Sequence, residues 1–231
     1  MDGLFTGVGP VLQAWDLDKP GDNMNVNTIK LLGISGSPRI ASTDFAAKFA
    51  LQYAREKYQI ETDYVTVHRK TLNFCIHCDF CVKKKEGCIQ KDDVQEIYPK
   101  LEWANAWILA SPVYQGQISG QLKTILDRCR AVVAKNPKVF ENKVGAAIAV
   151  GGDRNGGQDP TLQTILDFYI INEMIPVGGG SFGANLGAAV WSKDKGAKGS
   201  EADEEGLRTI HRTVDRLIKV ASLIHARDIN G

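Results

Sequence analysis

The chain has 231 residues, of which 43% are hydrophobic and 24% charged, and its formal net charge is +1. These values are typical of a soluble globular protein, and the lack of a basic excess argues against nucleic-acid binding. No run approaches the roughly 18 apolar residues of a membrane span, and the start lacks the charged and apolar regions of a secretory signal. We therefore expect a cytoplasmic protein without membrane contact that folds around one core.

The order of the predicted elements favours one α/β domain. Residues 1–28 show no clear periodicity and are interpreted as an N-terminal extension, which leaves residues 29–231 as the domain. Apolar or alternating runs predict strands at residues 29–35, 60–67, 106–110, 144–150 and 176–178. The segments between and after them predict helices at residues 43–58, 119–133, 159–174 and 203–225. Short strands that alternate with helices indicate a parallel sheet with helices on both faces.

Three other segments carry local signals. Asp92, with Gln95 three positions later, predicts a capped helix that continues towards Trp103 unless Pro99 kinks or ends it. The pair Asp159-Pro160 predicts a helix start with Asp159 as its N-cap. Residues 183–200 are rich in Gly, Ala, Lys and Ser, a composition that predicts a mobile loop.

Loops rich in glycine and serine follow three of the predicted strands, where open α/β sheets bind their ligands. The loop at residues 35–39 offers hydroxyls, amides at a helix N-terminus and the charge of Arg39, which together suit a phosphate. It lacks the lysine of a P-loop and the third glycine of a dinucleotide fingerprint, so we expect a monophosphate. The loops at residues 111–116 and 151–158 can border a planar ring. The alternative for each loop alone is a tight turn without a ligand.

In combination these loops carry a family resemblance. The motifs Gly-x-Ser-Gly-Ser-Pro-Arg, Ser-Pro-Val-Tyr-x-Gly-x-x-Ser-Gly and Gly-Gly-x-Arg-x-Gly-Gly-Gln resemble the flavodoxin-like NAD(P)H-dependent FMN reductase family. The resemblance spans residues 30–224 and implies a three-layer α/β sandwich whose five-stranded parallel sheet has the order 2-1-3-4-5. It also implies FMN as the cofactor and a homodimer or homotetramer as the assembly.

The resemblance implies FMN-binding residues in each of the three loops. Those of the phosphate loop and the following helix start are Ser35, Ser37, Arg39, Ser42 and Thr43. Those that would line the isoalloxazine ring are Pro112, Val113, Tyr114, Gln115 and Gly116. Those that would border the far side of the ring are Gly152, Asp153, Arg154 and Gly157.

Four of the five cysteines lie between residues 75 and 88, in the pattern C-x2-C-x2-C-x6-C on a loop inserted after strand 2. Such crowding makes a poor disulfide framework and is typical of metal or redox chemistry in a reducing compartment. Four thiolates at short spacing suit an iron–sulfur cluster. The pattern resembles the iron–sulfur flavoproteins, the branch of the same family that carries a [4Fe–4S] cluster beside FMN. The implied ligands are Cys75, Cys78, Cys81 and Cys88. The alternatives are a zinc site and thiols that hold no metal.

Three other features are interpreted without a role as metal ligands. His77 stays outside the expected ligand set, because four thiolates already satisfy a metal. Cys129 lies among aliphatic residues and is predicted to be a buried structural cysteine. Residues 83–85 are lysines that predict a solvated loop or, alternatively, a surface that attracts an acidic donor protein.

The leading hypothesis is a flavin-dependent oxidoreductase that transfers electrons between a one-electron donor, such as ferredoxin, and an acceptor through the cluster and FMN. Because the chemistry belongs to the cofactors, no catalytic acid or base is assigned. One alternative is an NAD(P)H-dependent reductase of FMN or quinones. The other is a zinc-stabilised flavodoxin-like binding module.

Overall fold

The computed structural model describes residues 26–180 and 183–225 of the chain. The strands are β1 (Lys30–Ser35), β2 (Glu61–Thr66), β3 (Ala106–Pro112), β4 (Val144–Gly151), β5 (Ile175–Val177) and β6 (Ala188–Trp191). The helices are α1 (Ser42–Tyr58), α2 (Phe80–Lys84), the 3-10 helix η2 (Asp93–Glu96), α3 (Tyr98–Trp103), α4 (Gly120–Arg128), α5 (Arg130–Lys135), α6 (Gln158–Ile171), α7 (Ala197–Glu201) and α8 (Glu204–His225). The predicted extension at residues 1–28 lies almost wholly outside the described residues.

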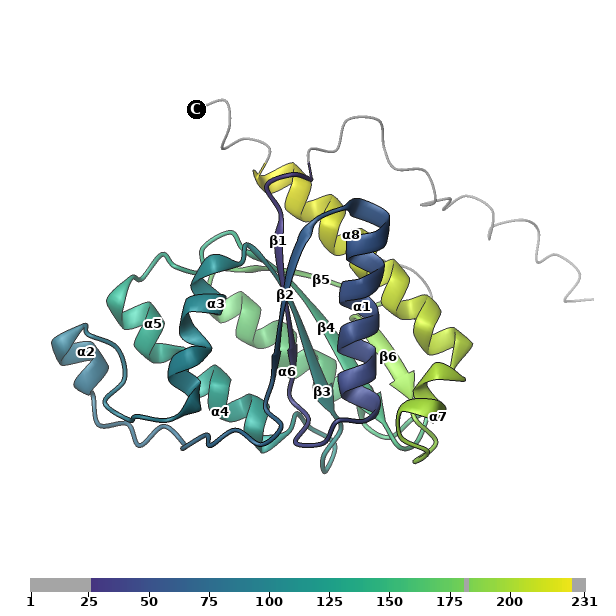
Figure 1. Ribbon diagram of the computed structural model, residues 1–231, viewed down its shortest axis with the longest axis horizontal. Helices are drawn as coiled ribbons and strands as arrows, with labels where there is room; N and C mark the ends of the chain where they lie inside the picture. The colour runs from purple at the N-terminus through teal and green to yellow at the C-terminus, as the bar shows by residue number, and fades with distance from the viewer. Residues whose placement is uncertain (1–25, 181–182, 226–231) are drawn as a thin grey trace, which may run out of the picture.

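The sheet has the predicted order β2-β1-β3-β4-β5, and all of its strand pairs are parallel. Every residue of β3 and β4 is buried, because helices cover both faces of these central strands. The strands share one direction, so the loops after β1, β3 and β4 meet at one edge, at the bottom of the sheet in Figure 1. The predicted flavodoxin-like sandwich is confirmed.

A sixth strand, β6, also pairs with β4. Strand β5 pairs with the start of β4, at Val144–Ala146, and β6 pairs with its end, at residues 148–151. The edge position beside β4 is therefore filled by two short strands in line, with residues 178–187 between them. The prediction of one loop over residues 183–200 was wrong, since β6 lies within it and α7 begins within it.

The expected single core is divided by the sheet into two hydrophobic clusters, one on each face. One packs α1 and α8 against side chains of the central strands such as Ile108 and Ile148. The other packs α3, α4 and α6 against the opposite face, where Trp107 and Leu109 are fully buried. In Figure 1 these layers stand on the right and the left of the sheet. Within the described ranges, none of the helices has the length and apolar character that crossing a bilayer requires.

Three predicted helices have other boundaries. The helix predicted at residues 119–133 divides at Cys129 into α4 and α5. Helix α6 begins at Gln158 after Gly157 as N-cap, so Asp159 lies in its first turn and is not its cap. The helix predicted after Asp92 divides at Ile97, and Pro99 lies in the first turn of α3, where its missing N–H costs nothing.

Candidate functional site: an open cofactor edge and a cysteine segment

The loop between β1 and α1 has the features of an anion site. The Ser37 hydroxyl donates to the Arg39 carbonyl at 2.9 Å and accepts from the Arg39 N–H at 3.1 Å, which closes a tight turn. The N-cap of α1 is Ala41, so no side chain occupies the free N–H groups of the first helical turn. Arg39 is exposed beside them. Free amides at a helix start and a nearby guanidinium are the groups that hold a phosphate.

The loop between β3 and α4 is a two-residue hairpin turn. The N–H of Tyr114 donates to the carbonyl of Gln117 at 2.9 Å, and the reverse bond measures 3.1 Å. Gln115 and Gly116 have φ angles of 51° and 77°, as a type I′ turn requires. Tyr114 is 37% exposed, so its ring is open to a ligand or a partner.

The loop between β4 and α6 is held by the side chain of Gln158. Its Nε2 donates to the Asp153 carbonyl at 2.6 Å, and its Oε1 accepts from the Gly156 N–H at 2.8 Å. Gln158 is itself only 4% exposed. Two hydrogen bonds from one buried side chain therefore hold the shape of the loop.

Two contacts join these loops to one another. Ser119, the N-cap of α4, donates its hydroxyl to the Gly36 carbonyl at 2.5 Å and so ties the first loop to the second. Gly157 has a φ of 107°, and a Cβ built on it would lie 2.8 Å from the Gly116 Cα, so the second and third loops touch through glycines. The three loops form one continuous rim, which suits a ligand with a phosphate at one end and a ring at the other.

Arg154 of the third loop is directed away from this rim. Its Nη2 pairs with Asp203 at 2.9 Å, and its guanidinium lies 4.7 Å from the Trp191 ring centroid. Trp191 in turn donates to the Gly152 carbonyl at 2.7 Å. A cavity of about 590 Å³ lies on this side, between the third loop, β6 and the start of α8. Its lining includes Arg154 and Gly157 of the predicted FMN residues.

The structure places the remaining predicted FMN residues along the same rim. Ser35 ends β1, Ser42 and Thr43 begin α1, and Pro112 and Val113 connect β3 to the hairpin turn. Two residues of the rim were missed in the sequence. His68 binds the Pro38 carbonyl through Nδ1 at 2.7 Å, and Ser119 joins two loops. Ser119 belongs to the second motif, whereas nothing in the sequence marks His68.

The cysteine segment, residues 75–88, follows β2 and extends to the side of α5 (Figure 1). Cys75 and Cys78 are exposed, whereas Cys81 and Cys88 are partly buried and pack against the core. Positive φ angles at His77, Asp79 and Lys85 bend the backbone between them. No group of three or more potential ligand side chains is gathered for a metal ion anywhere in the described residues. The donor set itself, four thiols on one bent segment, fits an iron–sulfur cluster, whose binding is coupled to the ordering of its ligands.

The fifth cysteine has a different environment. Cys129 is 1% exposed at the junction of α4 and α5, and burial raises its pKa to about 12. Such a thiol stays protonated and does not serve as a metal ligand. This observation confirms the predicted structural role of Cys129.

Comparisons with known proteins agree with this geometry. Residues 29–189 match the family described as NADPH-dependent FMN reductase. An iron–sulfur flavoprotein of Methanocaldococcus jannaschii is 62% identical over 192 residues, which cover 83% of this chain and 96% of that protein. An iron–sulfur flavoprotein of Methanosarcina thermophila is 38% identical, with 85% and 97% covered. Among solved structures, RosB with a bound riboflavin-5'-phosphate intermediate has a TM-score of 0.65 at 17% identity, with 86% and 81% covered, which supports the fold.

Proposed function

Because the chain belongs to the NADPH-dependent FMN reductase family and, within it, to the iron–sulfur flavoproteins, we propose that it transfers electrons through FMN and a [4Fe–4S] cluster. The observation that carries this proposal is the joint placement of two features. The segment with Cys75, Cys78, Cys81 and Cys88 starts at the same carboxyl edge of the sheet as the three loops of the rim.

The proposed FMN site uses each loop for a different part of the cofactor. The start of α1, with Ser37, Arg39, Ser42 and Thr43, binds the phosphate through amides, hydroxyls and one positive charge. Residues 112–116 border one side of the ring, and Gly152, Asp153 and Gly157 border the other, whereas the Arg154 side chain pairs with Asp203. The hairpin turn and the hydrogen bonds of Gln158 support the site, because they hold the two loops in defined positions on either side of the ring.

The proposed cluster site uses the four cysteines of one segment, with His77 outside the ligand set. When bound, FMN accepts one or two electrons and the cluster accepts one. Together they can therefore connect a partner that transfers one electron to a partner that transfers two. The protein residues bind and orient the cofactors, and we assign none of them as a catalytic acid or base. A ferredoxin-like protein is the proposed donor, attracted by Lys83, Lys84 and Lys85 at the end of α2.

Three further proposals concern the whole chain. Residues 29–231 form the FMN-binding domain, with residues 1–28 as an extension to it. The assembly is a homodimer or homotetramer. Five cysteines without a disulfide among the described residues suit a reducing compartment, and we place the protein in the cytoplasm.

Analysis of anaerobically purified protein tests the proposal. We expect one FMN, four iron and four sulfide per chain, and an absorption shoulder between the flavin bands that fades on reduction. Zinc at one per chain without iron or sulfide would contradict the cluster and favour a zinc-stabilised module. Protein that does not retain FMN after reconstitution would contradict the proposed FMN site at the rim.

A second candidate function is an NAD(P)H-dependent reductase of FMN or quinones, which the description of the matched family favours. Stopped-flow mixing separates the two functions. Rapid bleaching of the flavin by NADPH alone would support the reductase. Bleaching by a reduced ferredoxin, with NADPH inert, would support electron transfer from a protein donor.

A further inference from the structure

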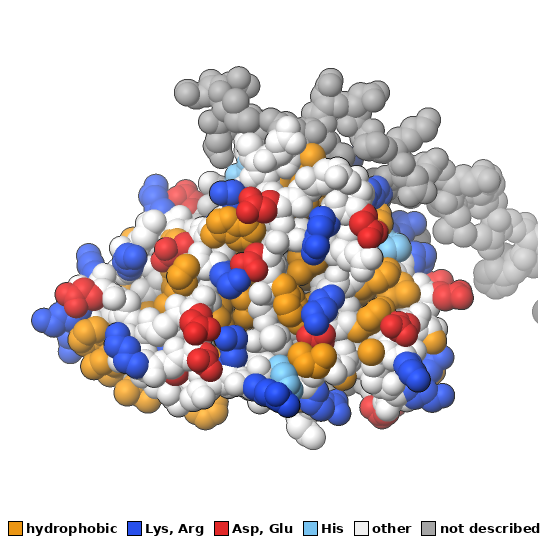
Figure 2. Space-filling view, in the orientation of Figure 1, with side chains coloured by type: hydrophobic (Ala, Val, Ile, Leu, Met, Phe, Trp, Pro, Cys, Tyr) orange, Lys and Arg blue, Asp and Glu red, His pale blue; other side chains and the backbone are white. Residues whose placement is uncertain are grey.

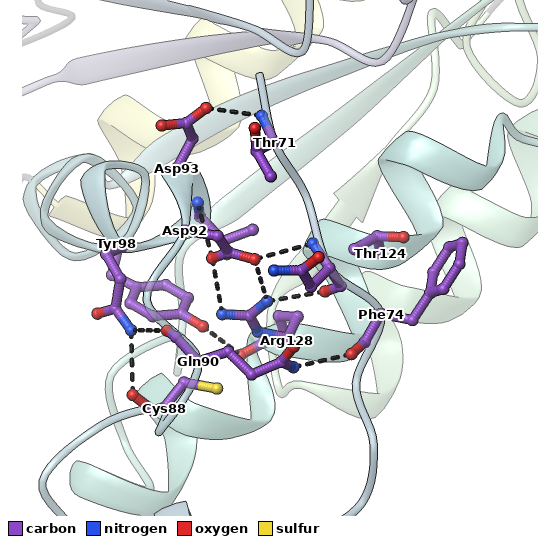
Figure 3. A network of polar contacts seen from close by, with 12 residues as sticks. Thr71, Phe74, Cys88, Gln90, Asp92, Asp93, Tyr98, Thr124 and Arg128 are labelled. Carbon is purple, nitrogen blue, oxygen red and sulfur yellow. Dashed lines mark hydrogen bonds and ion pairs between the residues drawn. The ribbon is translucent and has the colours of Figure 1, made fainter.

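A buried ion pair lies beneath the cysteine segment. The side chains of Arg128, the last residue of α4, and of Asp92, the N-cap of η2, are each 1% exposed. The guanidinium and the carboxylate pair in a bidentate manner, with Nη1–Oδ2 and Nη2–Oδ1 distances of 2.8 and 3.0 Å (Figure 3). Two parallel charge-assisted bonds fix the relative orientation of the two groups as well as their distance.

The pair also binds the first end of the cysteine segment. Arg128 Nη1 donates to the Asn73 carbonyl at 2.8 Å, and the Asn73 N–H donates to Asp92 Oδ2 at 2.8 Å. Both backbone groups of residue 73, two positions before Cys75, are thus held by the ion pair. Figure 3 shows the backbone between Thr71 and Phe74 lying directly alongside the two side chains.

The second end of the segment is joined to the same network through two glutamines. Gln90 Nε2 donates to the Phe74 carbonyl at 2.8 Å, which connects the two ends directly. Gln95 Nε2 donates to the carbonyls of Cys88 and Gln90 at 3.0 and 2.7 Å. Asp92 is placed between these residues and caps η2 through a bond from the Val94 N–H at 3.3 Å.

These hydrogen bonds are important because the segment has little secondary structure of its own. Residues 70–79 form no helix or strand, and α2, with five residues, is the only regular element between Cys75 and Cys88. The ends of the segment are therefore fixed by hydrogen bonds from side chains and not by the backbone hydrogen bonds of a β-sheet. A buried ion pair adds little net stability compared with an apolar pair of similar volume, so stability alone does not account for Arg128 and Asp92.

We propose that the Arg128–Asp92 pair is a positioning device for the [4Fe–4S] cluster. It holds the two ends of the cysteine segment together, so that Cys75 and Cys88 can bind the same cluster. The inference rests on the proposed function and deepens it, because it assigns residues outside the ligand set to the cluster site. Groups hydrogen-bonded to metal ligands typically change metal affinity by about 10- to 100-fold when removed. The pair acts one step further out, through residue 73, so we expect an effect at the lower end of this range.

Four variants test the proposal in the full, anaerobically purified protein. Arg128→Met removes the bidentate ion pair and the contact with the Asn73 carbonyl. Arg128→Lys keeps the positive charge but cannot form two parallel hydrogen bonds to the carboxylate. The double variant Arg128→Met/Asp92→Leu replaces the buried pair with apolar side chains. The matched control is Lys123→Met, which removes an exposed ion pair with Asp127 on the same helix.

The readouts are iron and FMN per chain, the rate of iron release to a chelator, and the electron paramagnetic resonance spectrum of the reduced cluster. We expect Arg128→Met to release iron about tenfold faster or more, with FMN content unchanged. Arg128→Lys should lie between it and the wild type, and Lys123→Met should match the wild type. The double variant should resist urea better than Arg128→Met, because no unpaired buried carboxylate is left, but should not regain iron retention, which separates positioning from stability.

The outcomes distinguish this inference from the function on which it rests. Wild-type protein without iron and sulfide would overturn the proposed function and the inference with it. Wild-type protein with four iron, together with variants that match its release rate and spectrum, would overturn the positioning role alone. If Arg128→Met does not fold, Arg128→Lys and Asp92→Asn decide the question, since wild-type iron release in both would contradict the proposal.

Discussion

At the scale of single residues, the cysteines of this chain have two kinds of environment. Cys129 is enclosed by the junction of α4 and α5, and its thiol has a raised pKa of about 12. Cys75 and Cys78 are exposed, and Cys81 and Cys88 are partly buried on the same segment. Metal ligation requires the thiolate, which an enclosed apolar site disfavours. The chemistry of these residues therefore depends on exposure as much as on spacing.

A first prediction compares Cys88→Ala with Cys129→Ala. We expect Cys88→Ala to lose the iron–sulfur absorption and to keep FMN, because the segment then has three thiolates. Cys129→Ala should keep both cofactors and lower the free energy of unfolding by about 1 kcal/mol through the small void it leaves. Iron analysis, visible spectra and urea unfolding measure these effects. Equal loss of iron in both variants would contradict the assignment of the ligands.

A second prediction concerns His211, whose ring stacks on Phe49 and Tyr53 with centroid distances of 5.1 and 4.1 Å. Burial lowers the pKa of His211; Asp215 raises it and Lys57 lowers it further. The unfolded chain therefore binds this proton at a higher pH than the folded one does, so stability decreases as pH falls through the ordinary histidine pKa of about 6.5.

His211→Gln should reduce that decrease. Urea unfolding at pH values of about 7.5 and 5.5 compares the wild type with the variant. The wild type should lose more free energy of unfolding over this interval than His211→Gln does. An equal loss in both proteins would show that the acid sensitivity comes from other groups.

At the scale of elements, the helix start at Ser119 connects the first loop to the second. Its hydroxyl caps α4 by accepting from the Leu122 N–H at 3.1 Å and also donates to Gly36. Ser119→Ala should lower the free energy of unfolding by about 1–2 kcal/mol and weaken FMN binding, because the loop after β1 loses its anchor. The control is Ser222→Ala, whose hydroxyl bonds the Lys219 carbonyl within α8.

Fluorescence titration with FMN and urea unfolding measure the two effects of Ser119→Ala. A variant that loses stability but binds FMN as tightly as the wild type would contradict the proposed rim. Ser222→Ala should leave FMN binding unchanged.

A related prediction concerns the contact between the second and third loops. Gly157→Ala adds a Cβ at a φ of 107° and only 2.8 Å from the Gly116 Cα, so the two loops must separate. We expect a loss of about 1–3 kcal/mol in stability and weaker FMN binding. Gly180→Ala is the control, because its φ is also positive, at 68°, but its Cβ meets nothing within 4 Å. Equal FMN affinity in the two variants would contradict a role for the contact.

The central elements could be predicted because their sequence signals are strong. The apolar runs that became β3 and β4 are buried on both faces, as parallel strands require. β6 could not be predicted from the composition of residues 183–200. It forms because β5 ends at Val177 and leaves the second half of β4 open on the side away from β3, which is a property of the assembled sheet.

The candidate site was predictable to a similar degree. The three loops and the four cysteines were visible as motifs, since glycine, serine and cysteine carry local signals. The contacts that join them were not visible. Asp92 and Arg128 are 36 positions apart and Ser119 and Gly36 are 83 apart, so only the strand order brings them together.

At the scale of the whole molecule, exposed apolar side chains gather near the cysteine segment and the end of α6. Phe74, next to the cysteine segment, and Ile76 within it are 73% and 67% exposed. Val82 of α2 and Ile171 at the end of α6 are 45% and 78% exposed and line the same hollow. Figure 2 shows orange side chains at the lower left, where α2 and the cysteine segment lie in Figure 1. Apolar side chains exposed together on a surface are typical of protein interfaces, which supports the proposed oligomer.

A last prediction tests that interface. Ile171→Lys should shift the protein towards monomers in sedimentation velocity, because a buried lysine at an interface loses its hydration. Leu223→Lys, at a residue 61% exposed on α8, is the matched control and should leave the assembly unchanged. Monomeric wild-type protein, or an Ile171→Lys variant that keeps its oligomeric state, would contradict an interface at this surface.

The network around Arg128 and Asp92 also has a consequence for assembly of the protein. The bonds that join residues 73, 74, 88 and 90 belong to the folded chain and contain no metal. The entropic cost of closing the loop that carries the cysteines is therefore offset by the protein's own hydrogen bonds when the chain folds. The chain itself joins the two ends of the loop, and only the residues between them remain to be arranged around a ligand.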